Sequence, residues 1–486
     1  MLGDTSKRHA PPQVLGFILA IATSVILGLA LATLNVSVGA ILAGATLVVL
    51  LAPILYRVVL GRFDLFEPIT LFAAMYALIF VVRPAYMLAE SENTFVIGLE
   101  SVNYSNYVTE MQVAALIGAV GFVFGYEFLR IRSISRKGTK TRDPNIRTLS
   151  SGGVILLFLG LLSTILYWGK LPGGYGAIFA GRSDAFYETT TQISSYLIYA
   201  PNLLIPGAML MLIVWLKTRR LWPLLLSVAG ICLVLAVRLP IGSRLTLLPL
   251  LLGLIVFYYL YRGRRPGGAA VATGIILIAV LWSLVLQSRY QDPGTGQDSY
   301  GASISTIITD PVKVLDPVLK GQDLAMAPGL ASAMGVIPEK VPFQYGTGLV
   351  GDIATRGIPR QFWANKPLPA REKVINELWP KGYAFSIANP EFSVLFHFYV
   401  DGSFIGILLG LSLYGFAFRA LRDFTFRGPR DPIVLLIYAL LMCNIPMLLR
   451  DSPTDSLMRL GFSVAPLVLV AWLATRSSRS QNNSFQ

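Results

Sequence analysis

About twelve apolar stretches, each roughly 20 residues long, limit what this chain can fold into more than any other feature. A helix of that length crosses the ~30 Å hydrocarbon core of a bilayer. Only 14% of the 486 residues are charged, whereas soluble domains carry roughly 25%. We therefore expect an all-α polytopic membrane protein. The predicted spans are 14–33, 36–56, 68–88, 109–129, 151–169, 194–216, 221–239, 244–261, 269–287, 393–418, 432–449 and 457–474.

The lysines and arginines between these stretches predict the orientation, because cytoplasmic loops of membrane proteins are enriched in them. Seven lie between Arg130 and Arg147, whereas residues 89–108 contain three glutamates and no basic residue. Both termini are predicted to be cytoplasmic. The expected organisation is nine spans in 1–287, an extracytoplasmic loop at 288–391, three spans in 392–475 and a cytoplasmic tail at 476–486.

The net charge of +14 does not indicate a nucleic-acid partner, because the basic residues lie in short loops between apolar runs. Cys232 and Cys443 lie inside apolar runs, where cysteine acts as a small hydrophobe. We predict neither a disulfide nor a metal site. Ala30-Leu31-Ala32 at the end of the first run could be a signal-peptidase site, but that run is long for a cleaved signal. An uncleaved anchor is the favoured interpretation.

The segment GTGLVGDIATRGIPRQFWANKP, Gly346 to Pro367, is the most distinctive part of the long polar loop. Arg356 and Arg360 present planar, permanently charged groups that suit phosphate oxygens. Pro359 and Pro367 stiffen the backbone around them. From composition alone, an ordinary surface loop with solvated charges is an equal alternative.

Five further arginines are predicted near the outer ends of different spans. Charged residues within spans are costly and usually functional. Arg83 would lie about 8 Å inside its helix end at 1.5 Å per residue. For any one arginine, snorkelling to lipid headgroups is the simpler explanation, but five at one depth favour a shared site. They are Arg83, Arg238, Arg244, Arg450 and Arg459, and Arg289 joins them at the start of the loop.

Three residues where the loop re-enters the membrane are acid–base candidates: Glu391, His397 and Asp401. His397 and Asp401 are four residues apart and would share a helix face, although Asp401-Gly402-Ser403 is expected to break that helix. A lone histidine in apolar surroundings can equally be structural. Short helices are also expected in the loop at about 322–335 and at 371–379.

The order of residues in the loop closely resembles the signature Y-G…I-P-R-x-x-W-x-x-K-P of Wzy-type oligosaccharide repeat-unit polymerases. The matching residues are Tyr345-Gly346, Ile358-Pro359-Arg360, Trp363 and Lys366-Pro367. Gly242-Ser243-Arg244 is similar to a G-S-R element of the same family, and Arg450-Asp451 to its C-terminal R-G/D element. Where the family often has E-x-Y-x-N-x-G-x-x-G, this chain has His397, Tyr399, Asp401, Ser403 and Gly406. Those departures leave the identity of a base open.

The resemblance implies a metal-independent glycosyltransferase without a cofactor, in the bacterial cytoplasmic membrane. It would join undecaprenyl-diphosphate-linked oligosaccharides, as donor and acceptor, into a surface polysaccharide at the outer face. Arginines would stabilise the departing diphosphate, and Glu391 or His397 would act as base. The catalytic candidates are Glu391, His397, Arg360 and Arg244, and the diphosphate-binding candidates are Arg83, Arg238, Arg289, Arg356, Trp363, Lys366, Arg450 and Arg459.

Two other classes remain open at this point. A transporter or flippase for lipid-linked sugars would also have about twelve spans, but it should carry charges or helix breaks near the bilayer midplane. An O-antigen-ligase-like transferase, or an acyltransferase, would share the lipid-facing architecture. Besides the lipid-linked sugars and the bilayer, the implied partners are a chain-length regulator and a flippase.

Overall fold

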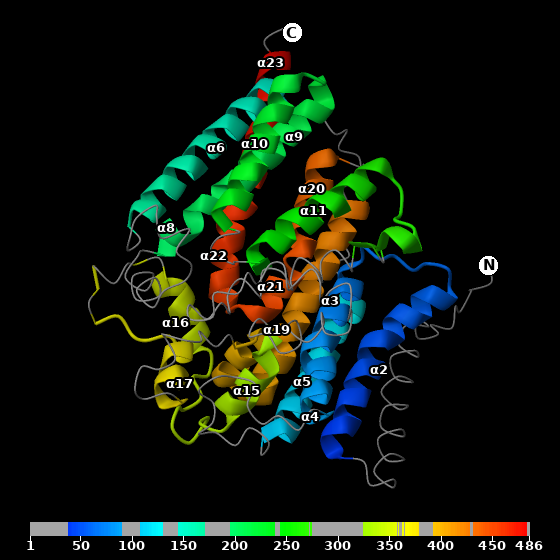
Figure 1. Ribbon diagram of the computed structural model, residues 1–486, viewed down its shortest axis with the longest axis vertical. Coiled ribbons are helices and arrows are strands. Elements are labelled where there is room, and N and C mark those ends of the chain that lie inside the picture. The colour runs from blue at the N-terminus through cyan, green and yellow to red at the C-terminus, as the bar shows by residue number, and fades with distance from the viewer. Residues whose placement is uncertain are drawn as a thin grey trace, which may run out of the picture.

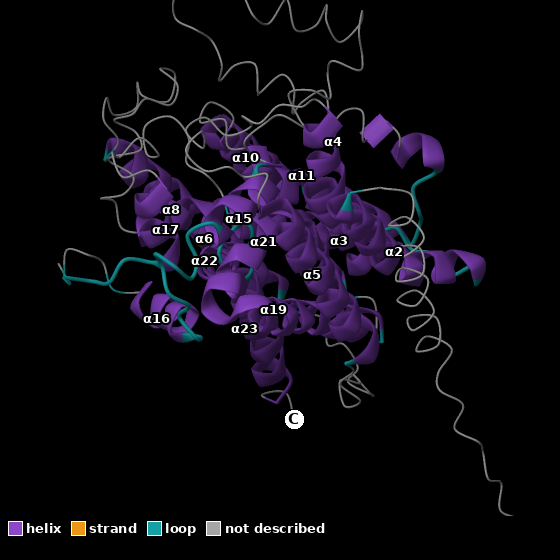
Figure 2. Cartoon of the chain, turned by 90° about the horizontal axis from the view of Figure 1, so that it is seen from below, coloured by secondary structure: helices purple, strands orange, loops and turns teal. Residues whose placement is uncertain are grey.

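The computed structural model describes residues 37–89, 107–129, 144–170, 195–238, 244–271, 273–274, 324–356, 358, 362–363, 365–378, 392–427 and 431–483. Within these ranges the chain forms helices and loops and no strand (Figures 1 and 2). Eight helical segments of this part of the chain are long and apolar enough to cross a membrane. For the described residues, the prediction of an all-helical chain with several membrane spans is confirmed.

Three of the eight spans are continuous helices, one is a helix with an internal break, and four are built from shorter pieces. The continuous ones are α2 (Val38–Val59), α5 (Val108–Phe128) and α6 (Ile146–Gly169). The broken one is α19 (Val394–Phe426), whose backbone is not helical at Gly402 and Ser403. The composite ones are α3 (Pro68–Ala77) with the π-helix η1 (Leu78–Val82) and α4 (Arg83–Ala89); α8 (Ser195–Tyr199) with the 3-10 helix η4 (Ala200–Leu203) and α9 (Leu204–Thr218); α20 (Pro432–Cys443) with α21 (Ile445–Arg450); and α22 (Pro453–Ser463) with α23 (Ala465–Asn483).

Two further predicted spans correspond to α10 (Leu221–Arg238) and α11 (Arg244–Arg262), whose apolar parts are shorter. The predicted span 14–33 lies outside the described residues, as does nearly all of 269–287. The number of twelve spans therefore stays a prediction.

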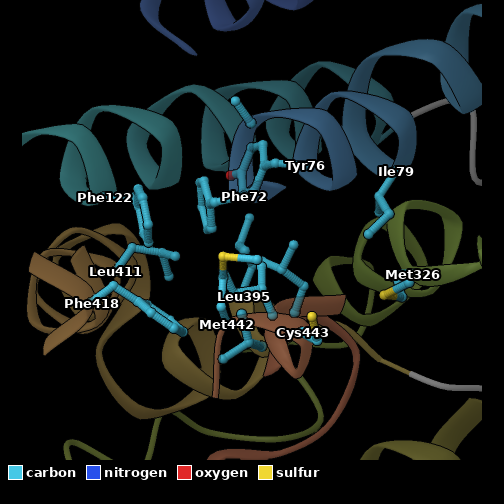
Figure 3. Packing of buried hydrophobic residues seen from close by; sticks show 14 of the residues in the cluster. Phe72, Tyr76, Ile79, Phe122, Met326, Leu395, Leu411, Phe418, Met442 and Cys443 are labelled. Carbon is cyan, nitrogen blue, oxygen red and sulfur yellow. The ribbon is translucent and has the colours of Figure 1, made fainter. Parts of the chain in front are cut away.

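The centre of the bundle is the contact between α5 and α19, which pack along their length. Glycine allows that close approach, since a Cβ at Gly121 would lie 2.7 Å from the carbonyl oxygen of Leu408. Small residues serve this purpose in membrane helix pairs generally. Aromatic rings fill the adjoining core, and those of Phe72 and Phe122 stack with centroids 3.4 Å apart. Figure 3 shows this cluster, with Phe418 of α19 beside Phe122.

A chain reversal divides α19 into two legs that lie side by side. The backbone leaves the helical conformation at Gly402 and Ser403, where Ser403 has φ +56°. The rings of Phe398 and Tyr414 have centroids only 5.7 Å apart, although sixteen residues of continuous helix would separate them by about 24 Å. The expected break after Asp401 is therefore present, and it is a hairpin with Asp401 at its tip.

Three shorter helices lie at the lower end of the molecule in Figure 1: α15 (Met326–Met334), α16 (Thr347–Arg356) and α17 (Ala370–Leu378). Helices were expected near α15 and α17, and both are present. Val374, Ile375 and Leu378 form the buried face of α17, as their spacing predicted. The first half of the signature segment is the helix α16, whereas its composition suggested a loop; the capping described below explains the difference.

Candidate functional site

The tip of the α19 hairpin holds the start of the signature segment by its backbone. Gln344 N donates to Val400 O at 2.8 Å, and Gly346 N donates to Asp401 O at 3.0 Å. Between these two bonds the chain turns through Tyr345 and Gly346, which have φ of +47° and +83°. Glycine adopts such a conformation without strain. The Tyr-Gly pair of the signature is thus a turn that docks on the hairpin.

The carboxylate of Asp401 then caps α16 from a different part of the chain. Its Oδ2 accepts a hydrogen bond from Leu349 N at 2.8 Å, and the first N–H groups of a helix have no partner within the helix. Gly348 leaves room for this contact, because a Cβ there would lie 2.6 Å from Asp401 Oδ1. The signature helix therefore begins where it does because Asp401 lies there.

A second carboxylate, Asp455 in the first turn of α22, holds the other end of α16. Arg356, the last residue of α16, forms an ion pair with Asp455 and a longer one, 3.5 Å, with Asp352. Tyr199 donates its hydroxyl to Asp455 Oδ1 at 2.9 Å. Ser452, which caps α22, donates to Asp455 Oδ2 at 2.7 Å and accepts from Asp455 N at 2.9 Å.

This network keeps Arg356 charged. Its burial alone would lower the pKa of the guanidinium, but the negative charges of Asp455 and Asp352 outweigh burial, so the pKa lies above its ordinary value. Because the positive charge is already matched by two carboxylates, Arg356 connects α16 to α22 and has little charge left for a separate anion.

A cavity of about 120 Å³ lies between α16, α17, the hairpin and α22. Its volume suits a hydroxyl group and a few waters. The ionisable side chains of its wall include four carboxylates and two guanidiniums, so the wall accepts hydrogen bonds from hydroxyl groups better than it attracts an anion. These side chains are Asp352, Arg356, Arg371, Glu372, His397, Asp401 and Asp455.

Two of the predicted site residues, His397 and Arg356, line this cavity together. Trp363 and Lys366 follow α16 along the signature and do not line it; Lys366 Nζ donates to Ile358 O at 3.2 Å. Arg459 pairs with Asp451 and lines a separate small cavity.

The structure does not place the other predicted arginines in the wall of this cavity. Arg83 is fully buried at the start of α4, and Arg450 ends α21. For Arg238 and Arg244 only the backbone is described, at the end of α10 and the start of α11. Glu391, Arg289 and Arg360 lie outside the described residues.

Sequence reasoning missed Asp455, Tyr199, Asp352 and Arg371. Ser452-Pro453-Thr454-Asp455 matches the pattern of a helix start, a Ser cap with an acid three residues later, and that pattern could have located Asp455. Nothing in the local sequence marks Tyr199, the last residue of α8, which reaches Asp455 through the packing of α8 and η4 against α22.

Among the described residues, no three His, Cys, Asp or Glu side chains lie close enough together to hold a metal ion. Comparison of the chain with models of protein families, with curated proteins and with solved structures gives no match.

Proposed function

We propose that this protein polymerises lipid-diphosphate-linked oligosaccharide repeat units into a polysaccharide, and that the cavity between α16 and the hairpin receives the reacting hydroxyl of the acceptor sugar. One observation supports this most directly. The signature segment, on which the resemblance to the polymerases depends, is held by Asp401 and Asp455 so that Arg356 and His397 line one cavity.

The composition of the cavity suits an acceptor hydroxyl. Carboxylates bind sugar hydroxyls by accepting their protons in hydrogen bonds, and Asp352, Asp401 and Asp455 all face the cavity. In the reaction the acceptor oxygen forms a bond to the anomeric carbon of the donor sugar. The bond from that carbon to the diphosphate oxygen breaks, and the diphosphate takes the bonding electrons.

A base must take the proton of the attacking hydroxyl, from within about 3 Å. His397 is the described candidate, since its imidazole lies in the cavity wall. Glu391, which lies outside the described residues, is the other.

The departing diphosphate must be stabilised by positive charge. The cavity does not supply it, because its wall has more carboxylates than guanidiniums. We assign this role to Arg360, four residues after Arg356 in the signature, and to Arg244 at the start of α11. Loss of one well-placed donor to a developing oxyanion typically costs about 3 kcal/mol, or 10²–10³ in rate.

The test is incubation of purified full-length protein with its lipid-linked repeat unit, with and without EDTA, followed by gel separation of the products. We expect a ladder of chain lengths in both conditions. Arg360→Ala and Arg244→Ala should leave only single units, while Arg220→Ala, which removes an exposed arginine between α9 and α10, should give the wild-type ladder.

The same assay distinguishes the remaining classes. Movement of the lipid across vesicles without a ladder would identify a flippase. Transfer of one finished chain to a different acceptor, without elongation, would identify a ligase. Normal ladders from both arginine variants would refute the assignment of the arginines.

A further inference from the structure

A second group of charged side chains lies at the end of the bundle away from the signature helix. It consists of Arg57 in the last turn of α2, Glu67 before α3, Glu127 near the end of α5, and Arg419 and Arg422 in the second leg of α19. These side chains line a cavity of about 230 Å³, larger than the cavity beside α16.

The second leg of α19 separates the two cavities. Phe404 follows the hairpin tip, and Arg422 lies eighteen residues further on, a rise of about 27 Å at 1.5 Å per residue. That distance is close to the ~30 Å of the hydrocarbon core. The two cavities are therefore separated along α19 by about the thickness of a bilayer core.

The arginines of this cavity are held in place by two buried carboxylates. Arg57 contacts Glu67 at 3.0 Å and Glu127 at 2.5 Å, and Arg422 contacts Glu67 at 3.0 Å. Glu67 is 3% exposed and Glu127 is 7% exposed. Because both acids are buried behind the arginines, the guanidiniums have little freedom to rearrange.

Tyr126 further orders the group. Its hydroxyl donates to Glu67 at 3.1 Å, and the guanidiniums of Arg57 and Arg419 lie 5.9 and 5.4 Å from the centre of its ring. Such cation–π contacts leave the edge of the guanidinium, with its N–H groups, available to another acceptor.

Positive charge exceeds negative charge in this cavity. Its wall includes the guanidiniums of Arg57, Arg62, Arg419 and Arg422 and the carboxylates of Glu67 and Glu127. Asp423, next to the cavity, pairs with Arg419 and Arg422 at 3.3 Å each and is shared with Arg427 at 2.7 Å. With Asp423 and Arg427 included, five guanidiniums face three carboxylates, which leaves an excess of two positive charges. Arg62 is exposed to solvent. Within the part of the chain that the structure describes, no carboxylate forms an ion pair with it.

We propose that this cavity binds a phosphate group. Arginine donors in fixed positions match phosphate oxygens in geometry and charge, and an excess of two positive charges matches the one or two negative charges of a phosphate ester. Because the two cavities are separated by about the thickness of a bilayer core, a phospholipid headgroup is one source and a free phosphate ester the other. The proposal is independent of the proposed function, because none of these residues belongs to the signature or to the first cavity.

The test uses full-length protein purified in a neutral detergent. Native mass spectrometry would measure the retention of phosphatidylglycerol and of phosphatidylcholine, and calorimetry would measure the binding of inorganic phosphate. Selective retention of phosphatidylglycerol that phosphate does not displace identifies a headgroup site, and binding of phosphate alone identifies a site for a free ester; either result supports the proposal. Absence of both overturns it.

Variants connect the binding to these residues. Arg62→Ala removes an exposed side chain and Arg419→Gln keeps much of the shape; each should weaken retention about tenfold or more, the usual effect of losing a hydrogen bond to a charged group. Arg220→Ala is the control and should bind as wild type.

Glu127→Gln removes a competing negative charge and should bind more tightly, an effect that misfolding would not produce. Equal retention by wild type, Arg62→Ala and Arg419→Gln would refute the site.

Discussion

The carboxylate of Asp401 accepts a hydrogen bond from the backbone nitrogen of Leu349 at 2.8 Å, across 52 residues of sequence. This bond joins the tip of the α19 hairpin to the first turn of the signature helix α16. Together with the pair Arg356–Asp455, it holds both ends of α16 against the membrane bundle.

Replacement of Asp401 by alanine should release the start of α16. Loss of a helix cap costs about 0.5–2 kcal/mol, so we expect a lower melting temperature and faster hydrogen exchange at 347–352. Asp431→Ala is the matched control, because Asp431 caps α20 through Ile433 N at 2.9 Å. It should lower the melting temperature similarly without changing exchange in α16. Unchanged exchange in Asp401→Ala would contradict the capping role.

Two glycines of α16 should respond in opposite ways to the same substitution. Gly348→Ala places a Cβ against Gln344 Oε1 and 2.6 Å from Asp401 Oδ1, whereas a Cβ at Gly351 meets nothing within 4 Å. Overpacking typically costs about 1–3 kcal/mol, and Gly→Ala within a helix stabilises by about 0.5–1 kcal/mol. Urea or thermal unfolding in detergent should therefore show loss for Gly348→Ala and gain for Gly351→Ala. Equal effects would mean that Gly348 is not confined by Gln344 and Asp401.

The hydroxyl of Tyr199 should contribute to stability and to the rate of chain elongation, although Tyr199 is far from the signature in sequence. Tyr199→Phe removes one hydrogen bond to the carboxylate of Asp455, and such a bond to a charged group contributes about 1.5–3 kcal/mol. We expect reduced stability and slower chain elongation, since Asp455 also positions Arg356. The control is Tyr258→Phe, at an exposed tyrosine of α11, where no change is expected. A Tyr199→Phe protein with wild-type stability and rate would remove Tyr199 from the network.

The α5–α19 contact can be tested in the same way. Gly121→Ala brings a Cβ to 2.7 Å from the carbonyl oxygen of Leu408, whereas Gly44 in α2 has nothing within 4 Å. We expect Gly121→Ala to destabilise the protein by about 1–3 kcal/mol and Gly44→Ala, like Gly351→Ala, to stabilise it by about 0.5–1 kcal/mol. Similar melting temperatures for the two variants would show that α5 and α19 can move apart to accommodate a methyl group without loss of stability.

Most of the spans could be predicted from the sequence, because the length and apolarity that a bilayer requires are local properties. The short helices α15 and α17 were predictable for a similar reason, and Val374, Ile375 and Leu378 form the buried face of α17 as their spacing indicated. The break after Asp401 was also predictable from Gly402-Ser403. Its consequence, a hairpin that brings Phe398 to Tyr414, was not, because a break does not specify the angle that follows it.

The candidate site was predictable only in part. The pairing of Asp401 with α16 and of Arg356 with Asp455 depends on contacts between distant segments, which no local pattern encodes. Sequence reasoning therefore treated Arg356 as a phosphate ligand, although in the structure two carboxylates match its charge. It expected His397 and Asp401 to share a helix face, because they are four residues apart, and both side chains line one cavity.

The most direct test of a sugar-joining site at this cavity is the initial rate of ladder formation by His397→Gln protein. It should be compared with wild type at equal amounts of folded, purified protein. A general base contributes typically about 10²–10⁴ in rate, so we expect elongation to fall at least a hundredfold while binding of the lipid-linked unit is retained. A His397→Gln protein that elongates chains at the wild-type rate would contradict the assignment of the base to His397 in this cavity.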